Sequence, residues 1–481
     1  MRLTVILRIM GMLLALFSLT TVPPILISAY YHDGELLHFT ASLVIMQVSG
    51  VLLWFPCRNA DTNLGYREVF IVVPAFWLVL GMFAALPFIL GPHLSFTDSM
   101  FESISAFTTT GATVLVGLDQ MPKSILFYRQ ELQWLGGMGI IVLAIAILPM
   151  LRVGGMQLYR AETPGPMKSE KLTPRVAHAA RLLWIIYVGL TVVCALSFWV
   201  AGMTPFDAVA HSLSTISTGG FSTHDASIAY FKSVNIEILA EIFMVLAGIS
   251  FGVHFAALHG KSLRFYWQNA EVRTFLVIIF ALVLVVTLTQ LNFHHQMDIT
   301  HALRISTFQV ISVITSTGFA TDNFSLWPVF LPMLLIYISF MGGCAGSTAG
   351  GMKVIRMMIM IKHSMLNMRK MLYPESIQIA RVGGHILPER TLESVVAFFA
   401  TYILIFVVFS VLVMATGLDV VTAFSAVATC LNNLGPGLGD VASNFILVNS
   451  AAKWLLILSM LFGRLEIFAV LLMLTPEFWR R

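Results

Sequence analysis

Long apolar runs separated by short polar connections extend along almost the whole chain. A membrane helix needs about 20 predominantly apolar residues to cross a hydrocarbon core of roughly 30 Å. Runs near that length lie at residues 5–29, 39–56, 69–90, 127–150, 181–202, 236–258, 274–292, 327–362, 393–416 and 453–474. The pattern predicts an all-α integral membrane protein with about ten spans.

The first run follows Arg2 and Arg8, a charge pattern that also precedes the apolar core of a signal peptide. Such a core has roughly 7–15 residues, and the run at 5–29 is longer. We therefore interpret it as the first spanning helix.

Shorter semi-apolar segments recur between the long runs. They extend from Ser95 to Gly111, Thr204 to Gly219, Asp298 to Gly318 and Leu418 to Gly435. Each is too short or too polar to span a bilayer. The first two open with a hydroxyl residue three positions before an acid, which is a helix-start signal. The pattern predicts four short half-helices, each followed by a glycine loop.

The four glycine loops resemble one another. Aligned on the glycine, they read Thr109-Thr110-Gly111, Ser217-Thr218-Gly219, Ser316-Thr317-Gly318 and Asn433-Leu434-Gly435. A unit that recurs at intervals of roughly 100 residues is an internal repeat. We predict two N-terminal transmembrane helices (1–60) and four span–half-helix–loop–span repeats at 61–155, 176–262, 268–372 and 390–481, the third with an irregular segment at 342–351.

Composition supports a membrane protein and excludes other classes. The chain is 58% hydrophobic and 11% charged, whereas soluble domains carry about 25% charged residues. Its net charge of +4 is small and dispersed, so we expect no nucleic-acid partner. Four cysteines lie far apart without metal-ligand spacing, which favours small buried residues over a zinc site or disulfides. They are Cys57, Cys194, Cys344 and Cys430.

Basic residues concentrate on alternate connections between the runs. The richest connections are 152–181 and 353–390, and Arg480-Arg481 end the sequence. Cytoplasmic loops carry an excess of Lys and Arg. We therefore expect the basic connections and both termini to be cytoplasmic.

Four such loops at membrane depth predict a site for a cation. Irregular backbone is tolerated there only if it is buried in protein or lines a water-filled cavity. Glycine lets the backbone turn its carbonyls toward a common axis, and rings of carbonyls replace the hydration shell of a cation in potassium-type filters. Half-helices that enter from outside would also aim their partly negative C-termini at that point. The loops therefore predict cation stabilisation without a ring of carboxylates.

These residues resemble the Trk/Ktr/HKT superfamily of potassium transporters, and within it the membrane subunit of bacterial Trk systems. The match covers the whole length and rests on the four loops, on the Gly-rich stretch 342–351 and on Gly463-Arg464. The resemblance implies four covalently linked membrane–pore loop–membrane units plus two extra N-terminal helices. It also associates serine in place of the first filter glycine with sodium conduction in some members, so Gly111 favours potassium over the alternative of a sodium-permeable or non-selective channel.

The resemblance further implies where the protein works and with what. We expect potassium uptake across a bacterial inner membrane, a homodimer within the lipid bilayer, and a cytoplasmic TrkA-type regulatory subunit that binds NAD or ATP. Potassium would be the transported ligand, with no organic cofactor on this chain. Proton symport stays open, because no buried acid–histidine relay stands out.

A second feature lies within the third repeat and contains no large side chain. It reads Gly342, Gly343, Cys344, Ala345, Gly346, Ser347, Thr348, Ala349, Gly350 and Gly351. A stretch this rich in glycine is a poor helix, so the span at 327–362 should break there. The resemblance implies an intramembrane gate, and close helix packing through small residues is the alternative. A nucleotide loop is disfavoured because Met352 stands before Lys353 where that motif has glycine.

Arg464 is the one basic residue that we expect deep inside the last span. Intramembrane charge is expensive and usually faces the bundle interior or a cavity. We expect it beside the pore, where it helps to hold the gate; a structural pair with Glu102 or Glu241 is the alternative. His211 and Glu102 on the half-helices are expected to have packing or hydrogen-bonding roles rather than to coordinate an ion. Arg129 and Gln133, near the start of a span, are expected to be interfacial or interhelical rather than functional.

Two other classes of protein would need features that the sequence lacks. A multispan membrane enzyme requires a convergent catalytic constellation, and none stands out. An alternating-access carrier is often built from inverted repeats, whereas the units here share one topology. We therefore expect a cation pore and no enzyme.

Overall fold

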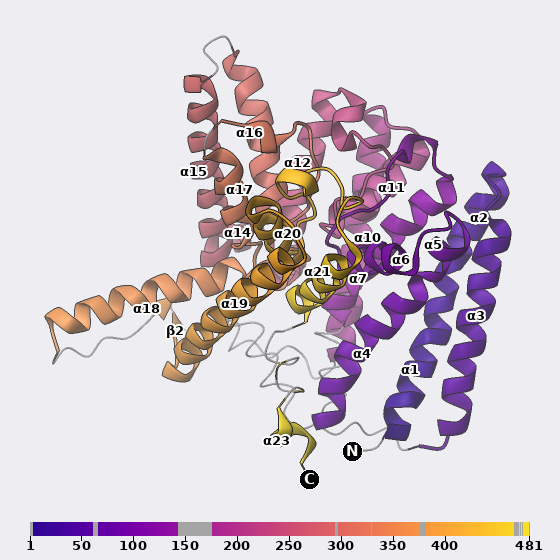
Figure 1. Ribbon diagram of the computed structural model, residues 1–481. Helices are drawn as coiled ribbons and strands as arrows, with labels where there is room; N and C mark the ends of the chain where they lie inside the picture. Colours follow the sequence, from indigo (N-terminus) through magenta and orange to yellow (C-terminus); the bar gives the residue numbers. More distant parts are fainter. Residues whose placement is uncertain are drawn as a thin grey trace.

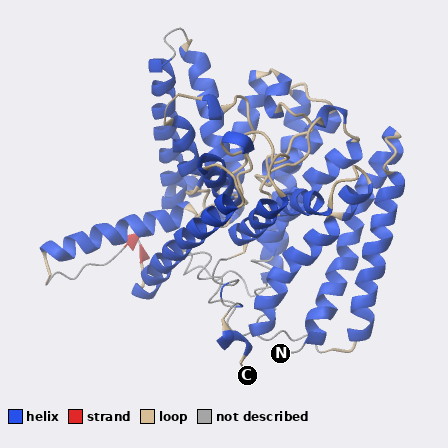
Figure 2. Cartoon of the chain, viewed as in Figure 1, coloured by secondary structure: helices blue, strands red, loops and turns tan. Residues whose placement is uncertain are grey.

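The computed structural model describes residues 3–60, 66–142, 176–293, 297–328, 330–374, 381–383, 385–465, 471, 473 and 475–480. This part of the chain is almost entirely helical, as Figure 2 shows. The exception is one small antiparallel hairpin, in which β1 (Arg381–Val382) pairs with β2 (His385–Ile386). The prediction of an all-α fold is confirmed for the described residues.

Three helices form the N-terminal part of the structure. They are α1 (Leu3–Phe17), α2 (Val22–Tyr31) and α3 (Leu36–Trp54), with 3-10 turns at Ser18–Thr21 and Phe55–Cys57. Helices α1 and α3 pack along each other. A β-carbon on Gly50 would lie 2.7 Å from the backbone nitrogen of Ala15, so the glycine permits this close approach.

The rest of the chain contains four units of similar design. The first unit contains α4 (Tyr66–Ala84), α5 (Leu86–Leu90), α6 (Phe96–Phe107) and α7 (Lys123–Val142), with a 3-10 turn at Leu118–Gln120. The second unit contains α10 (Val176–Val200), α11 (Pro205–Ile216), α12 (Val234–Gly248) and α13 (Phe251–His259), with a 3-10 turn at Ser227–Phe231. In each, a short helix (α6 or α11) lies between longer ones.

The third and fourth units repeat this order. The third unit contains α14 (Arg264–Gln268), α15 (Ala270–Phe293), α16 (Ile299–Ile314), α17 (Leu331–Ser339) and α18 (Val354–Leu372), with a 3-10 turn at Phe324–Leu326. The fourth unit contains α19 (Glu389–Ala415), α20 (Val420–Asn432), α21 (Ser450–Arg464) and α23 (Pro476–Trp479), with a 3-10 turn at Gly439–Val441. The helices here that correspond to α6 and α11 are α16 and α20, although α17 after α16 is shorter still. We refer to α6, α11, α16 and α20 as the short helices.

The units pack in a closed order around the short helices. Helix α7 contacts α11, α12 contacts α16, α17 contacts α20, and α21 returns to α6. In Figure 1 the short helices accordingly meet near the centre of the molecule. Each unit therefore supports the short helix of the next one, and the fourth supports the first.

Two buried apolar clusters follow this order. One joins the N-terminal helices with the first and fourth units and includes Phe101, Phe107 and Leu456. The other joins the second and third units and includes Phe243 and Phe308. The centre of the ring lies between them.

Six described helices are long and apolar enough to cross a membrane, and a seventh crossing exists if the bent pair α12–α13 counts as one. That pair turns by 94° at its break, where the sequence pattern predicts a continuous span at 236–258. The span predicted at 453–474 also differs, since α21 ends at Arg464 and Leu465 is extended. The predicted break in the span at 327–362 is confirmed, because α17 ends at Ser339 and α18 begins at Val354.

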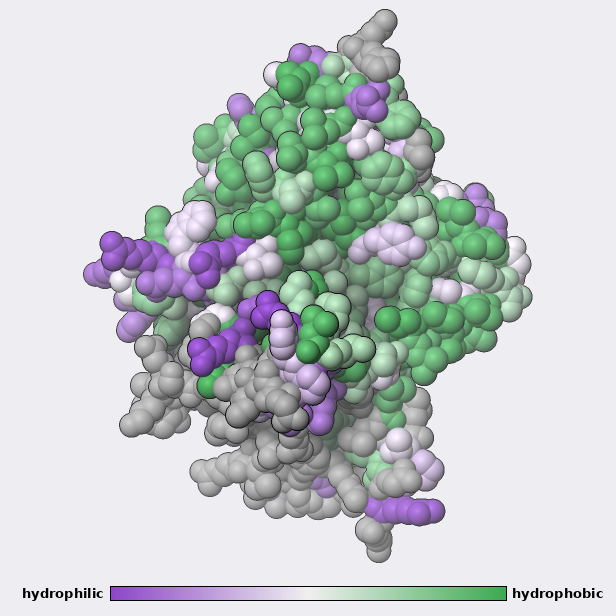
Figure 3. Space-filling model, turned by 90° about the vertical axis from the view of Figure 1, so that its left-hand side faces the viewer, coloured by the Kyte–Doolittle hydropathy of each residue, from purple (hydrophilic) through white to green (hydrophobic). Residues whose placement is uncertain are grey.

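The outer surface agrees with a lipid environment. In Figure 3 hydrophobic residues cover a broad area of the visible face, and hydrophilic ones form smaller groups. Large apolar side chains such as Val277, Phe280 and Leu284 on α15 are exposed. Figure 1 shows both ends of the chain at the same, lower end of the molecule.

The α1–α3 contact predicts opposite effects for two glycine substitutions. Gly50→Ala forces a β-carbon against backbone and should destabilise the protein by about 1–3 kcal/mol. Gly189→Ala on α10 meets nothing within 4 Å and should be neutral or stabilise by up to about 1 kcal/mol. Thermal unfolding of the detergent-solubilised variants checks both, and equal melting temperatures would contradict the close approach.

Candidate functional site: a ring of four backbone loops

Two of the four short helices begin at the side-chain caps that their sequences predict. Asp98 N donates to Ser95 Oγ at 3.1 Å, and Asp207 N donates to Thr204 Oγ1 at the same distance. Asp419 caps α20 by accepting from the backbone of Val421 and Thr422. These caps fix where three of the helices start, whereas Asp298 before α16 makes no side-chain cap bond. Each of the four helices then ends at a loop.

We name the turns after these helices loop 1 (108–111), loop 2 (217–220), loop 3 (315–318) and loop 4 (432–435). Every loop carries two residues with positive φ, separated by one residue. They are Thr109 (51°) and Gly111 (80°), Thr218 (53°) and Gly220 (78°), Ser316 (51°) and Gly318 (83°), and Asn433 (53°) and Gly435 (100°). The same backbone bond also recurs, in which the residue between them donates at 2.8 Å to the carbonyl five residues earlier. The four turns therefore share one backbone geometry.

This geometry shifts the alignment of loop 2 by one residue. Gly220, and not Gly219, has the positive φ of Gly111. Gly219 instead corresponds to Thr110, since its N–H donates to the Ser214 carbonyl as that of Thr110 donates to Ser105. Loop 2 contains two glycines in succession. An alignment on the Thr-Gly dipeptide therefore pairs Gly111 with Gly219, whereas the backbone geometry pairs it with Gly220.

The four loops close into a ring. A β-carbon on Gly111 would lie within 3.0 Å of the Gly219 carbonyl oxygen. The same overlap arises around the ring between Gly220 and the Thr317 oxygen, Gly318 and the Leu434 oxygen, and Gly435 and the Thr110 oxygen. Each glycine thus faces a carbonyl of the next loop, and any larger residue there would push the ring apart.

A cavity of about 400 Å³ opens on one side of this ring. Its walls include Gly111, Gly220, Gly318 and Gly435, one from every loop. The sequence predicts that one glycine from each loop meets the others around a common axis. With Gly220 in place of Gly219 in loop 2, these four glycines share one cavity. The cavity is therefore open to the backbone of all four loops.

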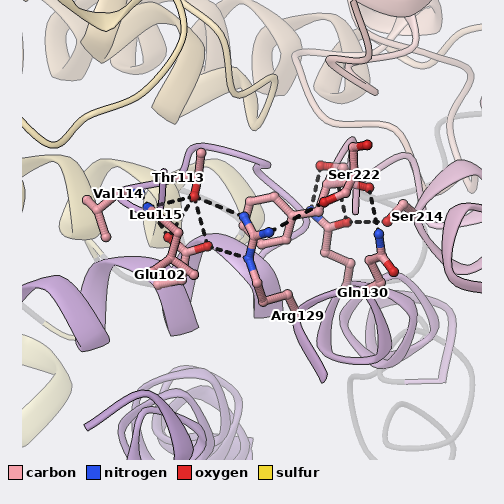
Figure 4. Close-up of polar contacts among 11 residues, drawn as sticks. Glu102, Thr113, Val114, Leu115, Arg129, Gln130, Ser214 and Ser222 are labelled. Atoms are coloured by element: carbon pink, nitrogen blue, oxygen red, sulfur yellow. Dashed lines mark hydrogen bonds and ion pairs between the residues drawn. The ribbon is translucent and has the colours of Figure 1, made fainter. Parts of the chain in front are cut away.

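A buried ion pair supports loop 1 from behind. Arg129 on α7 donates to Glu102 on α6 at 2.7 Å, and neither side chain is exposed. Glu102 also accepts from Thr113 Oγ1 and Val114 N, so it holds the chain just after the loop. Figure 4 shows Arg129 between this group and Ser222, beyond loop 2. The expectation of a hydrogen-bonding role for Glu102 is confirmed.

This pairing also bears on one of the two acids, Glu102 and Glu241, that are the alternative partners expected for Arg464. Glu102, one alternative partner, is occupied by Arg129. Arg464 donates instead to the carbonyls of Thr108 and Thr109 in loop 1 and to the Thr348 carbonyl, the last at 2.9 Å. Its guanidinium therefore bridges the loop ring and the Gly-rich stretch.

That stretch belongs to an irregular segment between α17 and α18, which we call the break segment (340–353). Gly342, Gly346 and Gly351 have positive φ. Gly350 N donates to Ser316 Oγ in loop 3, and Thr348 Oγ1 donates to the carbonyl of Ile216 at the end of α11. The break segment therefore contacts the start of the loops, on the side opposite the cavity.

Small residues are required where the break segment meets its neighbours. A β-carbon on Gly350 would overlap the Asn432 carbonyl, and one on Gly343 would lie 2.8 Å from the Gly248 carbonyl. A buried carboxylate holds both ends of the stretch, because Glu271 on α15 accepts from Ala345 N at 2.7 Å and Ile355 N at 3.1 Å. The small residues of the stretch thus pack closely against their neighbours. The sequence pattern does not predict the hydrogen bonds that Glu271 accepts here.

The second unit carries a polar cluster beyond the ring. His211, buried on α11, lies within hydrogen-bonding distance of the Asp207 carbonyl and of Ser222 Oγ, so its expected packing role is confirmed. His224 lies between Asp207 and Asp119, which link the first two units. Burial opposes protonation of His224, but hydrogen bonds and charge from the two carboxylates outweigh it and raise its pKa.

All four cysteines are buried and free, as the sequence predicts. Among the described residues no group of three or more His, Cys, Asp or Glu side chains could hold a metal ion. The oxygens that the four loops contain are backbone carbonyls, hydroxyls and the amide oxygens of Asn432 and Asn433.

Apolar helices around a central ring of backbone loops define a multi-span membrane protein. The sequence model of the TrkH family, described as "Cation transport protein", matches residues 36–480. The chain therefore belongs to the TrkH family of cation transport proteins, whose named homologues are transporters and not enzymes.

Relatives match over almost the full length. The chain is 51% identical to the Trk system potassium uptake protein TrkH of Vibrio parahaemolyticus over 479 residues, 99% of each chain. The TrkH of Escherichia coli is also 51% identical, over 480 residues and 98% of each chain. Its TrkG is 37% identical over 478 residues, 99% of this chain and 98% of TrkG. The crystal structure of the potassium transporter TrkH from Vibrio parahaemolyticus matches with a TM-score of 0.92, at 48% identity and 100% coverage of both chains.

The buried ion pair predicts a non-additive effect. Arg129→Met leaves the Glu102 carboxylate buried and unpaired, which should cost about 3–5 kcal/mol. Adding Glu102→Gln removes that charge and keeps an acceptor for Val114 N, so the double variant should be more stable than Arg129→Met alone. Thermal unfolding of the three proteins measures the difference, and a double variant less stable than the single would contradict the pairing.

Proposed function

We propose that this chain carries potassium ions across a bacterial inner membrane through the loop ring. The observation that supports this most directly is the closed order of the four loops, in which each glycine faces a carbonyl of the next. Membership of the TrkH family and relatives named as potassium uptake proteins support the choice of ion. Gly111 at the first loop agrees with potassium rather than sodium.

The proposed filter is formed by the loop residues expected from the sequence. These are Thr109, Thr110, Gly111, Ser217, Thr218, Gly219, Ser316, Thr317, Gly318, Asn433, Leu434 and Gly435, to which the backbone geometry adds Gly220. A carbonyl ring can replace part of the hydration shell of a cation. The C-terminal ends of α6, α11, α16 and α20 all meet the ring, and their partial negative charge would stabilise the same ion.

We propose the full architecture on the same grounds. Two N-terminal spans (1–60), the first formed by α1 and α2 and the second by α3, precede four units at 61–155, 176–262, 268–372 and 390–481, with about ten spans in all. Contacts in closed order between successive units support a four-unit pore. The connection 152–175 and residues 375–380 lie outside the described residues, so the basic connections stay predictions.

The break segment is the proposed gate, with residues 342–351 blocking the path below the filter. Its contacts with loop 3 and the end of α11 support this placement. Arg464 would hold the gate closed, because it joins Thr348 to loop 1, and its charge would discourage a cation from dwelling there.

We further propose a homodimer, both termini in the cytoplasm, and regulation by a TrkA-type subunit that binds NAD or ATP. The position of both chain ends at one end of the molecule agrees with this orientation. Ions would move down their electrochemical gradient, with proton symport as an open alternative. Potassium is the proposed transported ligand, without an organic cofactor on this chain.

Selective flux tests the filter. Proteoliposomes with the wild-type protein should take up Rb⁺ faster than Na⁺. Gly111→Ser introduces a β-carbon at positive φ, which costs roughly 1–3 kcal/mol and should lower the Rb⁺ to Na⁺ ratio by about tenfold or more. Equal Rb⁺ and Na⁺ flux through the wild type would refute potassium selectivity.

Flux also tests the gate. Deleting several residues within 342–351 should raise Rb⁺ flux. Arg464→Gln removes charged hydrogen bonds worth about 1.5–3 kcal/mol each, so its flux should rise roughly tenfold. If the deletion only lowers the yield of folded protein and Arg464→Gln leaves flux unchanged, close packing and not gating explains the segment.

A further inference from the structure

Loop 2 lacks a side chain where the other three loops carry one. The equivalent residues are Thr110, Gly219, Thr317 and Leu434. In loops 1 and 3 the threonine hydroxyl at this position lies 2.7 Å from the hydroxyl two residues earlier, on Thr108 and Thr315 respectively. Gly219 cannot make such a contact, although Ser217 occupies the corresponding earlier position.

Gln133 of the first unit fills the space behind Gly219. Its side chain extends from α7, and none of it is exposed. A β-carbon on Gly219 would overlap the Gln133 carboxamide, whereas the backbone would permit one because Gly219 is absent from the residues with positive φ. A side chain at this position would therefore compete with the Gln133 carboxamide for space, whereas the turn itself does not require glycine there.

Gln133 holds loop 2 at three points. Its Nε2 donates to the Gly219 carbonyl at 2.6 Å. Its Oε1 accepts from Ser214 Oγ at 2.9 Å and from Phe221 N at 3.2 Å. One carboxamide thus joins the end of α11, the ring carbonyl and the residue that follows the loop.

The hydrogen bond to Gly219 distinguishes this carbonyl from its equivalents. Between described residues, the carbonyls of Thr110, Thr317 and Leu434 accept no side-chain hydrogen bond, while that of Gly219 accepts one. The Gly219 carbonyl is also the one that Gly111 faces. Its direction therefore affects the spacing between loops 1 and 2.

We propose that Gln133 is a positioning residue of the ion site, which sets the Gly219 carbonyl and gives loop 2 the support that threonine gives loops 1 and 3. This inference rests on the proposed function of the ring as a potassium filter. An apolar side chain of similar size would fill the space, but it would leave Ser214 Oγ and Phe221 N without this acceptor and the Gly219 carbonyl without its donor. The hydrogen bonds of the carboxamide, and not the volume of the side chain, explain why this position carries glutamine.

A residue exchange tests the proposal. Gln133→Ala removes the three contacts and should lower the Rb⁺ to Na⁺ flux ratio by about tenfold. Gly219→Thr alone overlaps Gln133 and should lower it at least as much. In the double variant the introduced threonine has room and can pair with Ser217 as in loops 1 and 3, so the ratio should return to within about threefold of wild type.

Gln309→Ala is the matched control. Gln309 is a buried glutamine on α16 that donates to the Asp322 carbonyl at 2.7 Å. It should change the melting temperature more than the flux ratio. Each ratio is measured on protein that elutes as folded in detergent, so loss of yield does not enter it.

The outcomes separate two failures. Without Rb⁺ selectivity in the wild type, the proposed function fails. If the wild type is selective but Gln133→Ala keeps its flux ratio, or if the double variant is worse than both single variants, the role of Gln133 is refuted while the filter stands.

Discussion

Four backbone turns meet at the centre of this protein so closely that a β-carbon on any of the four glycines would overlap a carbonyl of the next turn. Carbonyl dipoles that converge on one point repel each other and have no bulk water around them, so they must be held from behind. The short helices hold them through the recurring 2.8 Å backbone bond at the end of each helix. The closed packing of α7, α12, α17 and α21 against the next short helix then keeps the four turns together. Most of the fold can be understood as support for this ring.

A single cation, Arg464, connects the ring to the break segment. It is the last residue of α21, and its guanidinium reaches carbonyls at the start of loop 1 and at Thr348. The end of a helix carries partial negative charge, and α6 ends at loop 1, so a positive group is stabilised there. The same charge opposes a cation on that side of the ring. One side chain therefore satisfies carbonyls of loop 1 and of the break segment at the same time. In the proposed function its charge would also make the path below the ring unfavourable for an ion as long as the break segment stays in place.

Much of this design could be predicted from sequence, because the signals were local. Hydrophobic run lengths gave the helices, Ser95 and Thr204 gave two helix starts, and the Gly-rich stretch gave the break after Ser339. Contacts between distant segments gave no such signal. Gln133 in the middle of α7 and Glu271 at the start of α15 look like ordinary polar residues of a helix, yet each accepts from or donates to backbone more than 70 positions away. The glycine pair in loop 2 was misaligned for a related reason, since φ, and not residue type, identifies the equivalent position.

A ring made from one chain can change the support of one loop without changing the others. All four loops keep the same pair of positive φ values and the same backbone bond, although the residue between those positions is threonine, glycine, threonine or leucine. The four loops thus share one backbone geometry, but different groups support it. Hydroxyl pairs support loops 1 and 3, and Gln133 supports loop 2. In loop 4 the amide of Asn433 donates to Thr110 Oγ1 of loop 1. Identical subunits would impose any such change four times around the axis. Here loop 1 meets Arg464, loop 3 meets the break segment and loop 2 meets Gln133, so a ring with four-fold backbone geometry is supported by contacts that each occur once.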